Sequence, residues 1–206
     1  MYIPNHFAVT DQSQQLDLIE RFSFGALTTV TAGRIRTSHI PFLLDRGAKP
    51  ALLAHLARAN PHWAELAGAT DLLVSFVGPH AYISPTWYGS PNQVPTWNYM
   101  AIEVRGRVQM LEDRAQRLGL VDRLSASHER NLAEPWRTDK LDTKRRNALL
   151  DAIVAFRIDI DSIEAKAKLG QNRSPAEIRS VAGELIRRDC RSAERQLALL
   201  MLEHAR

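Results

Sequence analysis

The feature that most constrains the fold of this chain is a stretch rich in proline and aromatic residues, residues 78–99. It reads GPHAYISPTWYGSPNQVPTWNY and carries prolines at positions 79, 85, 91 and 95. Proline removes a backbone N–H and clashes with the preceding turn, so this stretch cannot form a helix. Strand-like runs flank it at residues 71–77 and 101–110. The sequence therefore predicts a long, stiff connection between two strands, whose rings either plug a β-barrel or form a platform for a planar ligand or a partner subunit.

Short connections elsewhere predict an antiparallel sheet. The sequence predicts strands over residues 24–31, 35–44, 51–57 and 154–160, and the first three are separated by only a few residues. Connections this short cannot form parallel crossovers. Helical periodicity predicts helices over residues 12–21, 61–68, 114–128 and 143–153, and a last helix from residue 175 to the C-terminus. Ser174 and Glu177 form a capping-box pattern at its start. These elements together predict an α+β fold of about six strands built on a small antiparallel barrel with flanking helices.

The composition is that of a globular protein. The chain has 206 residues, of which 45% are hydrophobic and 24% charged, so one domain or one domain with a helical tail is expected. No apolar run approaches the roughly 20 residues that cross a bilayer, and the N-terminus lacks the layout of a signal peptide. The single cysteine, Cys190, lies in the last predicted helix and excludes an internal disulfide framework. We therefore expect a cytoplasmic protein.

The net charge of +4 is unevenly distributed along the chain. Residues 1–139 carry 13 Lys and Arg against 13 Asp and Glu, whereas residues 140–206 carry 14 against 10. The basic surplus of the last third either contributes to a nucleic-acid-binding surface or belongs to an ordinary solvated face.

Three polar clusters are candidates for ligand binding. The hydroxyls of Thr37 and Ser38 can hold a phosphate or the polar edge of a ring, or they are ordinary strand residues. Arg58 has a forked donor suited to phosphate just before the expected helix start at Asn60, whose other interpretation is a simple cap. Residues 166–173 (KAKLGQNR) offer amides and lysines to a flavin or a phosphate, or form a solvated connector.

Several kinds of catalytic site lack their sequence signature. The seven histidines show no metal-ligand spacing, and the chain contains neither a GxSxG elbow nor a GxxxxGK[ST] phosphate loop. A helix-turn-helix cannot be located either, because a predicted strand interrupts the candidate helix pair. We therefore predict no catalytic residue and no metal ligand.

Several segments in order resemble one family. MYIPNHF, TSHIPF, HLARANPHW, GPHAYISPTWY, VPTWNY, EVRGRV and KLGQNR, spread from residue 1 to about 173, closely resemble the PaiB family of bacterial FMN-binding negative transcriptional regulators. The resemblance implies an FMN-binding split β-barrel, a six-stranded antiparallel Greek-key barrel related to pyridoxamine-phosphate oxidases and flavin reductases. It further implies a split-barrel domain over residues 1–173 with inserted helices at about 113–153, and a C-terminal helix over residues 174–206 packed on that domain.

The resemblance also implies a homodimer with FMN in a groove between two subunits. Its cofactor-binding residues fall into four groups: a strand that lines the flavin, a phosphate site, two rings from the partner chain, and a closing segment. They are Thr37, Ser38 and His39; His55, Arg58 and Asn60; Trp97 and Tyr99; and Lys168, Gln171 and Asn172. Gly170 stands where we expect serine in this family, so either a hydroxyl contact is missing or glycine permits a different turn.

The function that the resemblance implies is transcriptional repression by a cytoplasmic homodimer that binds FMN, with DNA as a possible partner and no membrane. Two alternatives stay open at this point. One is a flavin-dependent oxidoreductase or flavin reductase that uses the same groove, with chemistry supplied by the cofactor. The other is a haem-binding split-barrel protein with a histidine as axial ligand.

Overall fold

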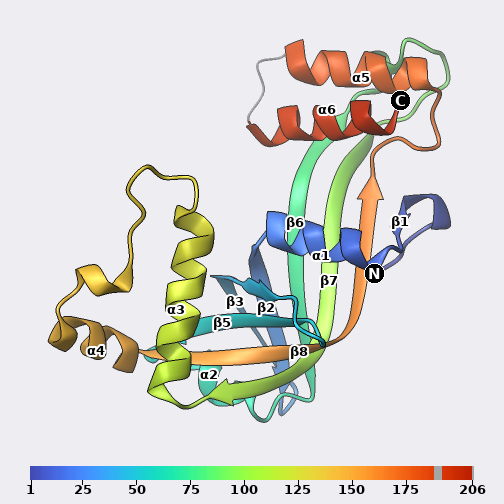
Figure 1. Cartoon of the computed structure of the whole chain (residues 1–206). Helices are drawn as coiled ribbons and strands as arrows, with labels where there is room; N and C mark the ends of the chain where they lie inside the picture. The colour runs from blue at the N-terminus through green and yellow to red at the C-terminus, as the bar shows by residue number, and fades with distance from the viewer. Residues whose placement is uncertain (188–191, 206) are drawn as a thin grey trace. The chain divides into compact units, whose positions relative to one another are not determined.

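The computed structural model describes residues 1–187 and 192–205, and its contacts divide the chain into two compact units. The first unit comprises residues 1–18, 76–103 and 164–206, and the second comprises residues 19–75 and 104–163. Neither unit is one continuous segment, because strands β6 (Asp71–Ile83), β7 (Thr96–Leu111) and β8 (Ile153–Lys168) each run from one unit into the other. The C-terminal helices fall within the first unit. Figure 1 labels the elements along the chain.

A hairpin begins the sheet of the second unit. Strand β2 (Phe24–Thr31) pairs antiparallel with β3 (Arg34–Pro41), and the turn between them places Ala32 and Gly33 at φ values of 50° and 75°. On its other edge β2 pairs with the beginning of β6. Strand β5 (Ala51–Ala57) pairs with β8, and the five-residue helix α2 (His62–Leu66) follows β5. The predicted antiparallel arrangement is confirmed.

Over the described residues the sheet has eight strands rather than the predicted six. Its order is β3-β2-β6-β7-β8-β5-β4, with β1 (Ala8–Val9) paired to β8. The segment predicted as one strand over residues 35–44 is divided into β3 and β4 (Leu43–Asp45) at Phe42, whose N–H donates to the carbonyl oxygen of Ser23 at 2.7 Å. Strand β1 was missed because two residues are too few for an alternating pattern to be visible.

The proline-rich stretch is less of a loop than its sequence predicted. Strand β6 continues through Pro79 to Ile83, β7 begins at Thr96, and the 3-10 helix η2 (Pro85–Tyr88) lies between them. Pairing of β6 with β2 ends at Ser75, so the missing N–H of Pro79 removes no hydrogen bond to β2. Only residues 84–95 connect the two strands, and the loop prediction for residues 78–83 and 96–99 is wrong.

Helix boundaries follow side-chain caps that the sequence displays. Helix α1 (Gln12–Arg21) is as predicted, and α3 (Arg114–Glu129) and α4 (Thr143–Asp151) begin at the predicted residues. Asp113 accepts a hydrogen bond from the N–H of Ala115 at 3.3 Å, and Asp142 accepts one from Arg145 at 2.8 Å. These carboxylates satisfy backbone donors that have no partner within the first helical turn.

The C-terminal segment forms two helices where one was predicted. Helices α5 (Pro175–Arg187) and α6 (Ser192–His204) pack side by side in the first unit (Figure 1). The capping box is confirmed, because Glu177 N–H donates to Ser174 Oγ at 3.3 Å and Ser174 N–H donates to Glu177 Oε2 at 2.9 Å. Cys190, predicted to be helical, lies outside the described residues. None of the described helices combines the length and the apolar character needed to cross a membrane.

Candidate functional site

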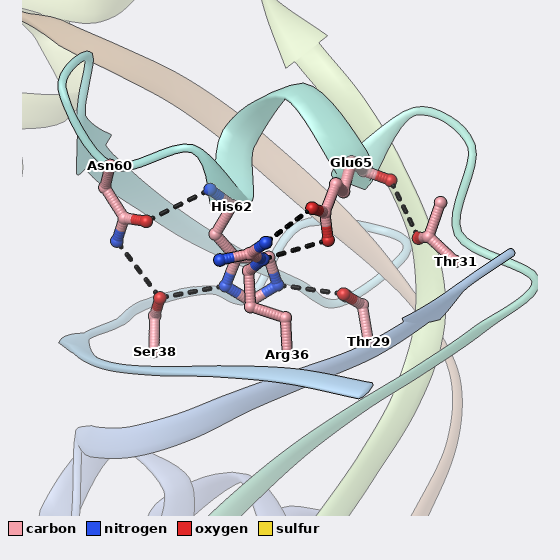
Figure 2. A network of polar contacts seen from close by, with 7 residues as sticks. All are labelled: Thr29, Thr31, Arg36, Ser38, Asn60, His62 and Glu65. Carbon is pink, nitrogen blue, oxygen red and sulfur yellow. Dashed lines mark hydrogen bonds and ion pairs between the residues drawn. The ribbon is translucent and has the colours of Figure 1, made fainter. Parts of the chain in front are cut away.

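A polar cluster of the second unit is centred on His62, at the start of α2 (Figure 2). The side chain of His62 is completely buried. Its Nε2 lies 2.8 Å from Thr29 Oγ1 on β2, and its Nδ1 lies 2.8 Å from Ser38 Oγ on β3. Strands β2 and β3 therefore hold the ring from two sides through one hydroxyl each.

Asn60 connects the helix start to the same hydroxyl. Its Oδ1 accepts the backbone N–H of His62 at 3.0 Å, and its Nδ2 donates to Ser38 Oγ at 3.1 Å. The helix begins at residue 62 with Pro61 rather than Asn60 at its N-cap position, so the predicted cap is displaced by one residue, and Asn60 contacts the helix start through the His62 N–H. Ser38 and Asn60 are thus two predicted site residues that the fold brings into direct contact.

An ion pair lies beside the histidine. Arg36 on β3 donates to both carboxylate oxygens of Glu65 on α2, at 3.0 Å from Nε and 2.7 Å from Nη2 (Figure 2). Thr31 Oγ1 donates to the carbonyl oxygen of Glu65 at 3.2 Å. This two-point pairing anchors α2 to the hairpin and fixes the position of His62 relative to Ser38.

The surroundings of His62 keep its ring neutral. Burial lowers the pKa of His62, the guanidinium of Arg36 lowers it further, and the carboxylate of Glu65 opposes the change. The hydrogen bond from Arg36 in turn holds the pKa of Glu65 below its ordinary value. The site at neutral pH therefore contains an uncharged imidazole between two hydroxyls.

Arg58 is held largely by backbone. Its Nε donates to the carbonyl oxygen of Asp151 at 2.7 Å, and its Nη2 donates to that of Ile153 at 3.2 Å. The guanidinium lies 5.9 Å from the ring centre of Trp63, whose indole N–H donates to the Arg58 carbonyl at 2.8 Å. These contacts leave the Nη1 hydrogens and one Nη2 hydrogen available to a ligand.

A cavity of about 370 Å³ in the second unit is lined by Arg58, Trp63 and Arg117, together with the exposed Glu112. Within the described part of the chain, two buried side-chain nitrogens have no hydrogen-bond partner: Nε of Arg117 and Nδ1 of His55. Burial lowers the pKa of His55 as well. Unsatisfied buried nitrogens are costly unless a ligand or water completes them.

The three predicted residues on β3 do not share a face. Successive side chains of a strand point to opposite sides, so Thr37 and His39 face away from Ser38. Thr37 Oγ1 lies 3.0 Å from Thr28 Oγ1 on the exposed side of the hairpin, and His39 is exposed opposite Ala26. Of the three, Ser38 alone has a recorded contact with the His62 cluster.

Trp97 and Tyr99 lie in the first unit. Trp97 is 53% exposed, and its ring centre lies 6.4 Å from that of Tyr82 and 6.1 Å from that of His80. Tyr99 is half-buried, with Nζ of Lys166 lying 5.0 Å from its ring centre. Exposed indole and phenol rings of this kind are common at binding surfaces.

The closing segment divides into structural and exposed residues. Lys168 donates to Thr96 Oγ1, and burial is the main cause of its lowered pKa. Gln171 uses both ends of its amide on backbone, accepting from Leu169 N–H at 2.8 Å and donating to the Ala167 carbonyl. Asn172 is exposed. Gln171 therefore stabilises the turn, and its amide has little left for a ligand.

Gly170 adopts a conformation that serine would strain. Its φ is +96°, in the region that side-chain-bearing residues rarely adopt, and its carbonyl accepts the N–H of Arg173 at 2.8 Å. Glycine therefore permits a left-handed turn at this position.

The sequence prediction missed Thr29, Arg36, His62 and Glu65. A signal for His62 was present, because it directly follows Asn60 and Pro61 in the expected helix start. What the sequence could not reveal was that the ring points into the hairpin, since Thr29 lies 33 positions away.

The residues of the second unit fit a phosphorylated, planar cofactor such as FMN. Ser38 offers a hydroxyl, and Arg58 offers donors beside a cavity that is also lined by Arg117, whose Nε has no partner. Phosphate and ring carbonyl oxygens of a flavin mononucleotide are acceptors, which such a donor set is suited to bind.

Comparisons with known proteins agree with this chemistry. A family model described as "Putative FMN-binding domain" matches residues 1–162. The chain is 35% identical over 204 residues to the Protease synthase and sporulation protein PAI 2 of Bacillus subtilis, covering 98% of this chain and 96% of that protein.

Two solved structures share the fold. The FAD and heme binding protein from Mycobacterium smegmatis is similar with a TM-score of 0.61 and 21% identity, over 79% of this chain and 74% of that chain. The flavocytochrome Anf3 from Azotobacter vinelandii has a TM-score of 0.56 and 14% identity, over 81% and 72%. At such identities the likeness establishes the fold alone, the split β-barrel with flanking helices.

Proposed function

Because this chain belongs to the PaiB family of FMN-binding proteins, we propose that it binds FMN as a homodimer and acts as a negative regulator of transcription. The observation that carries the FMN part is the donor set of the second unit. The Ser38 hydroxyl, held by Asn60 and His62, and the remaining hydrogens of Arg58 offer hydrogen bonds to an acceptor-rich ligand. When bound, FMN would supply a planar ring that can be reduced and reoxidised.

The binding test is a fluorescence titration with FMN. Arg58→Ala is expected to weaken binding about 10- to 100-fold, because a hydrogen bond to a charged group contributes about 1.5–3 kcal/mol. Arg107→Ala removes an arginine of the same unit whose side chain is 81% exposed, and it is the matched control. Arg58→Lys keeps the positive charge but removes the forked guanidinium, so its FMN affinity shows which of the two the ligand needs. Failure of the wild-type protein to bind FMN at high micromolar concentration would overturn the proposal.

The homodimer is supported by apolar surface in the first unit. Trp97 and Tyr82 are 53% and 46% exposed, and their edge-to-face arrangement forms a rigid aromatic surface. We expect Trp97 and Tyr99 to contact FMN bound by a partner subunit. Light scattering after gel filtration is expected to give twice the chain mass of 23.2 kDa. A Trp97→Ala protein that dimerises and binds FMN like the wild type would contradict this role for Trp97.

DNA binding is supported by the charge of α4. Lys144 and Arg145 are exposed in its first turn, where positive charge opposes the helix dipole. These residues therefore do not serve helix stability, and a phosphate backbone is a partner that would use them. The family resemblance, together with this basic turn, is what leads us to a DNA-binding repressor.

Gel shifts at several salt concentrations test the regulator. The double variant Lys144→Ala/Arg145→Ala is expected to weaken DNA binding. It is also expected to reduce the slope of log affinity against log salt concentration by the amount that corresponds to about two phosphate contacts. Arg105→Ala/Arg107→Ala removes two exposed arginines from β7 and serves as control. Absence of salt-dependent DNA binding would contradict repression, and steady oxidation of a nicotinamide by the FMN-loaded protein would indicate an oxidoreductase instead.

A further inference from the structure

The orientation of the Ser38 hydroxyl hydrogen can be derived from the contacts of its neighbours. Asn60 Oδ1 must be the atom that faces the His62 backbone N–H, since that N–H is a donor. The Nδ2 of Asn60 therefore faces Ser38 and donates to its Oγ. One acceptor position of the Ser38 oxygen is thereby occupied, and the remaining question is the direction of the Ser38–His62 hydrogen bond.

Two arrangements of the neutral ring are possible. If Ser38 donates to Nδ1, the ring hydrogen is on Nε2 and points at Thr29, so Thr29 must accept. If Nδ1 carries the hydrogen, it donates to Ser38, and Thr29 donates to the bare Nε2. The observed distances, 2.8 Å at each nitrogen, allow either direction.

Burial of Thr29 distinguishes the two arrangements. Thr29 is 1% exposed, and its contact with His62 is the one side-chain hydrogen bond recorded for it among the described residues. In the first arrangement its hydroxyl hydrogen would be buried without an acceptor, which is costly. In the second arrangement every buried donor of the cluster has a partner. The second arrangement is therefore favoured.

We propose that His62, as its Nδ1–H tautomer fixed by Thr29, is a positioning residue that makes the Ser38 hydroxyl a hydrogen-bond donor to the ligand. The Ser38 oxygen accepts from both Asn60 and His62, so its own hydrogen points away from them. Ser38 is only half-buried, so that hydrogen can reach a ligand. This inference rests on the proposed FMN binding and adds that the ligand atom at Ser38 is an acceptor, either a phosphate oxygen or an acceptor of the ring.

The tautomer is measured without any flavin. Nitrogen-15 NMR of protein labelled in histidine, with the His62 signals assigned from a His62→Gln variant, is expected to show the hydrogen on Nδ1. A hydrogen on Nε2 overturns the inference whatever the protein binds. Failure to bind FMN removes the proposed function but leaves this measurement meaningful, so the two failures are distinguishable.

Binding measurements test the consequence for the ligand. Ser38→Ala is expected to weaken FMN binding about 3- to 10-fold, the loss of one hydrogen bond. Thr29→Val keeps the shape but removes the hydroxyl that fixes the ring, so it is expected to weaken binding as well. Combined with Ser38→Ala, Thr29→Val is expected to add no further loss, whereas additive losses would overturn the inference.

Thr31→Val is the matched control. Thr31 lies on the same strand and the same face as Thr29, and its hydroxyl also bonds to α2, but through the Glu65 carbonyl rather than His62. Thr31→Val is expected to leave the His62 tautomer and the FMN affinity unchanged. If it weakens FMN binding as much as Thr29→Val does, loosening of α2 explains both effects and the inference is overturned.

A titration with riboflavin, which lacks the phosphate, identifies the acceptor at Ser38. If Ser38→Ala weakens riboflavin binding as much as FMN binding, the acceptor is an atom of the ring. If Ser38→Ala leaves riboflavin binding unchanged, the acceptor is a phosphate oxygen.

Discussion

The backbone of Gly106 on β7 lies so close to the carbonyl oxygen of Asp159 on β8 that no side chain fits between them. A methyl group at residue 106 would overlap that oxygen and crowd the side chain of Ile158. A glycine in the middle of a strand indicates a bulge or a close backbone approach. The close approach is the interpretation that the structure confirms.

Gly106→Ala is therefore expected to lower the free energy of unfolding by about 1–3 kcal/mol, because the added carbon must push two strands apart. Urea denaturation measures this loss. Gly119→Ala in α3 is the comparison: nothing lies within 4 Å of a carbon added there, and alanine favours the helix by about 0.5–1 kcal/mol. Equal effects of the two substitutions would contradict the steric explanation.

Stability is expected to fall as the pH drops below about 6.5. Burial lowers the pKa of both His62 and His55 in the folded protein from the ordinary value of 6.5. The unfolded chain therefore binds these protons first, so the stabilisation is complete above pH 6.5 and is lost as the pH falls. Urea midpoints at pH 7.5 and 5.5 measure the loss.

His62→Gln is expected to reduce that pH dependence, and His128→Gln, which removes an exposed histidine, is the comparison. Carboxylates with lowered pKa values, such as Glu65, contribute their own loss only at more acidic pH, below their ordinary value of 4.5. A pH profile of His62→Gln that matches the wild type would show that His62 does not contribute to it.

Removing either partner of the ion pair beside His62 is expected to change the pKa of His62, and the two changes are expected to have opposite signs. Arg36→Met removes a cation that lowers the pKa of His62, so that pKa is expected to rise. Glu65→Gln removes a carboxylate that raises it, so the pKa is expected to fall further. Titration of the His62 ring by NMR checks both, and shifts in the same direction would contradict the electrostatic explanation.

Gly170→Ser is expected to destabilise the protein by about 1–3 kcal/mol, because serine must adopt the φ of +96° that glycine holds there. Space is not the cause, since a carbon added at residue 170 would meet its nearest neighbour, in Ile178, at an ordinary 3.6 Å. Thermal denaturation measures the loss. Gly183→Ala in α5, where nothing lies within 4 Å, is expected to cause none.

Local patterns in the sequence were enough for much of the fold. The capping box of Ser174 and Glu177, the aspartate caps and the hairpin turn at Gly33 depend on residues within a few positions of one another, so they are readable from the chain. Strand alternation could also have separated Ser38 from Thr37 and His39, because it depends only on the period of two along β3.

The sequence by itself determined the family and the antiparallel sheet, and it predicted Ser38, Arg58 and Asn60 as binding residues. The tertiary structure alone decided that β4 separates from β3, that the last helix is two, and that His62 lies between Thr29 and Ser38. Those two hydroxyls are 33 and 24 positions from the ring. The physical reason is that burial of His62 depends on the register between β2 and β3 and on the docking of α2 by Arg36 and Glu65. Such contacts between distant segments leave no periodic signal in the chain.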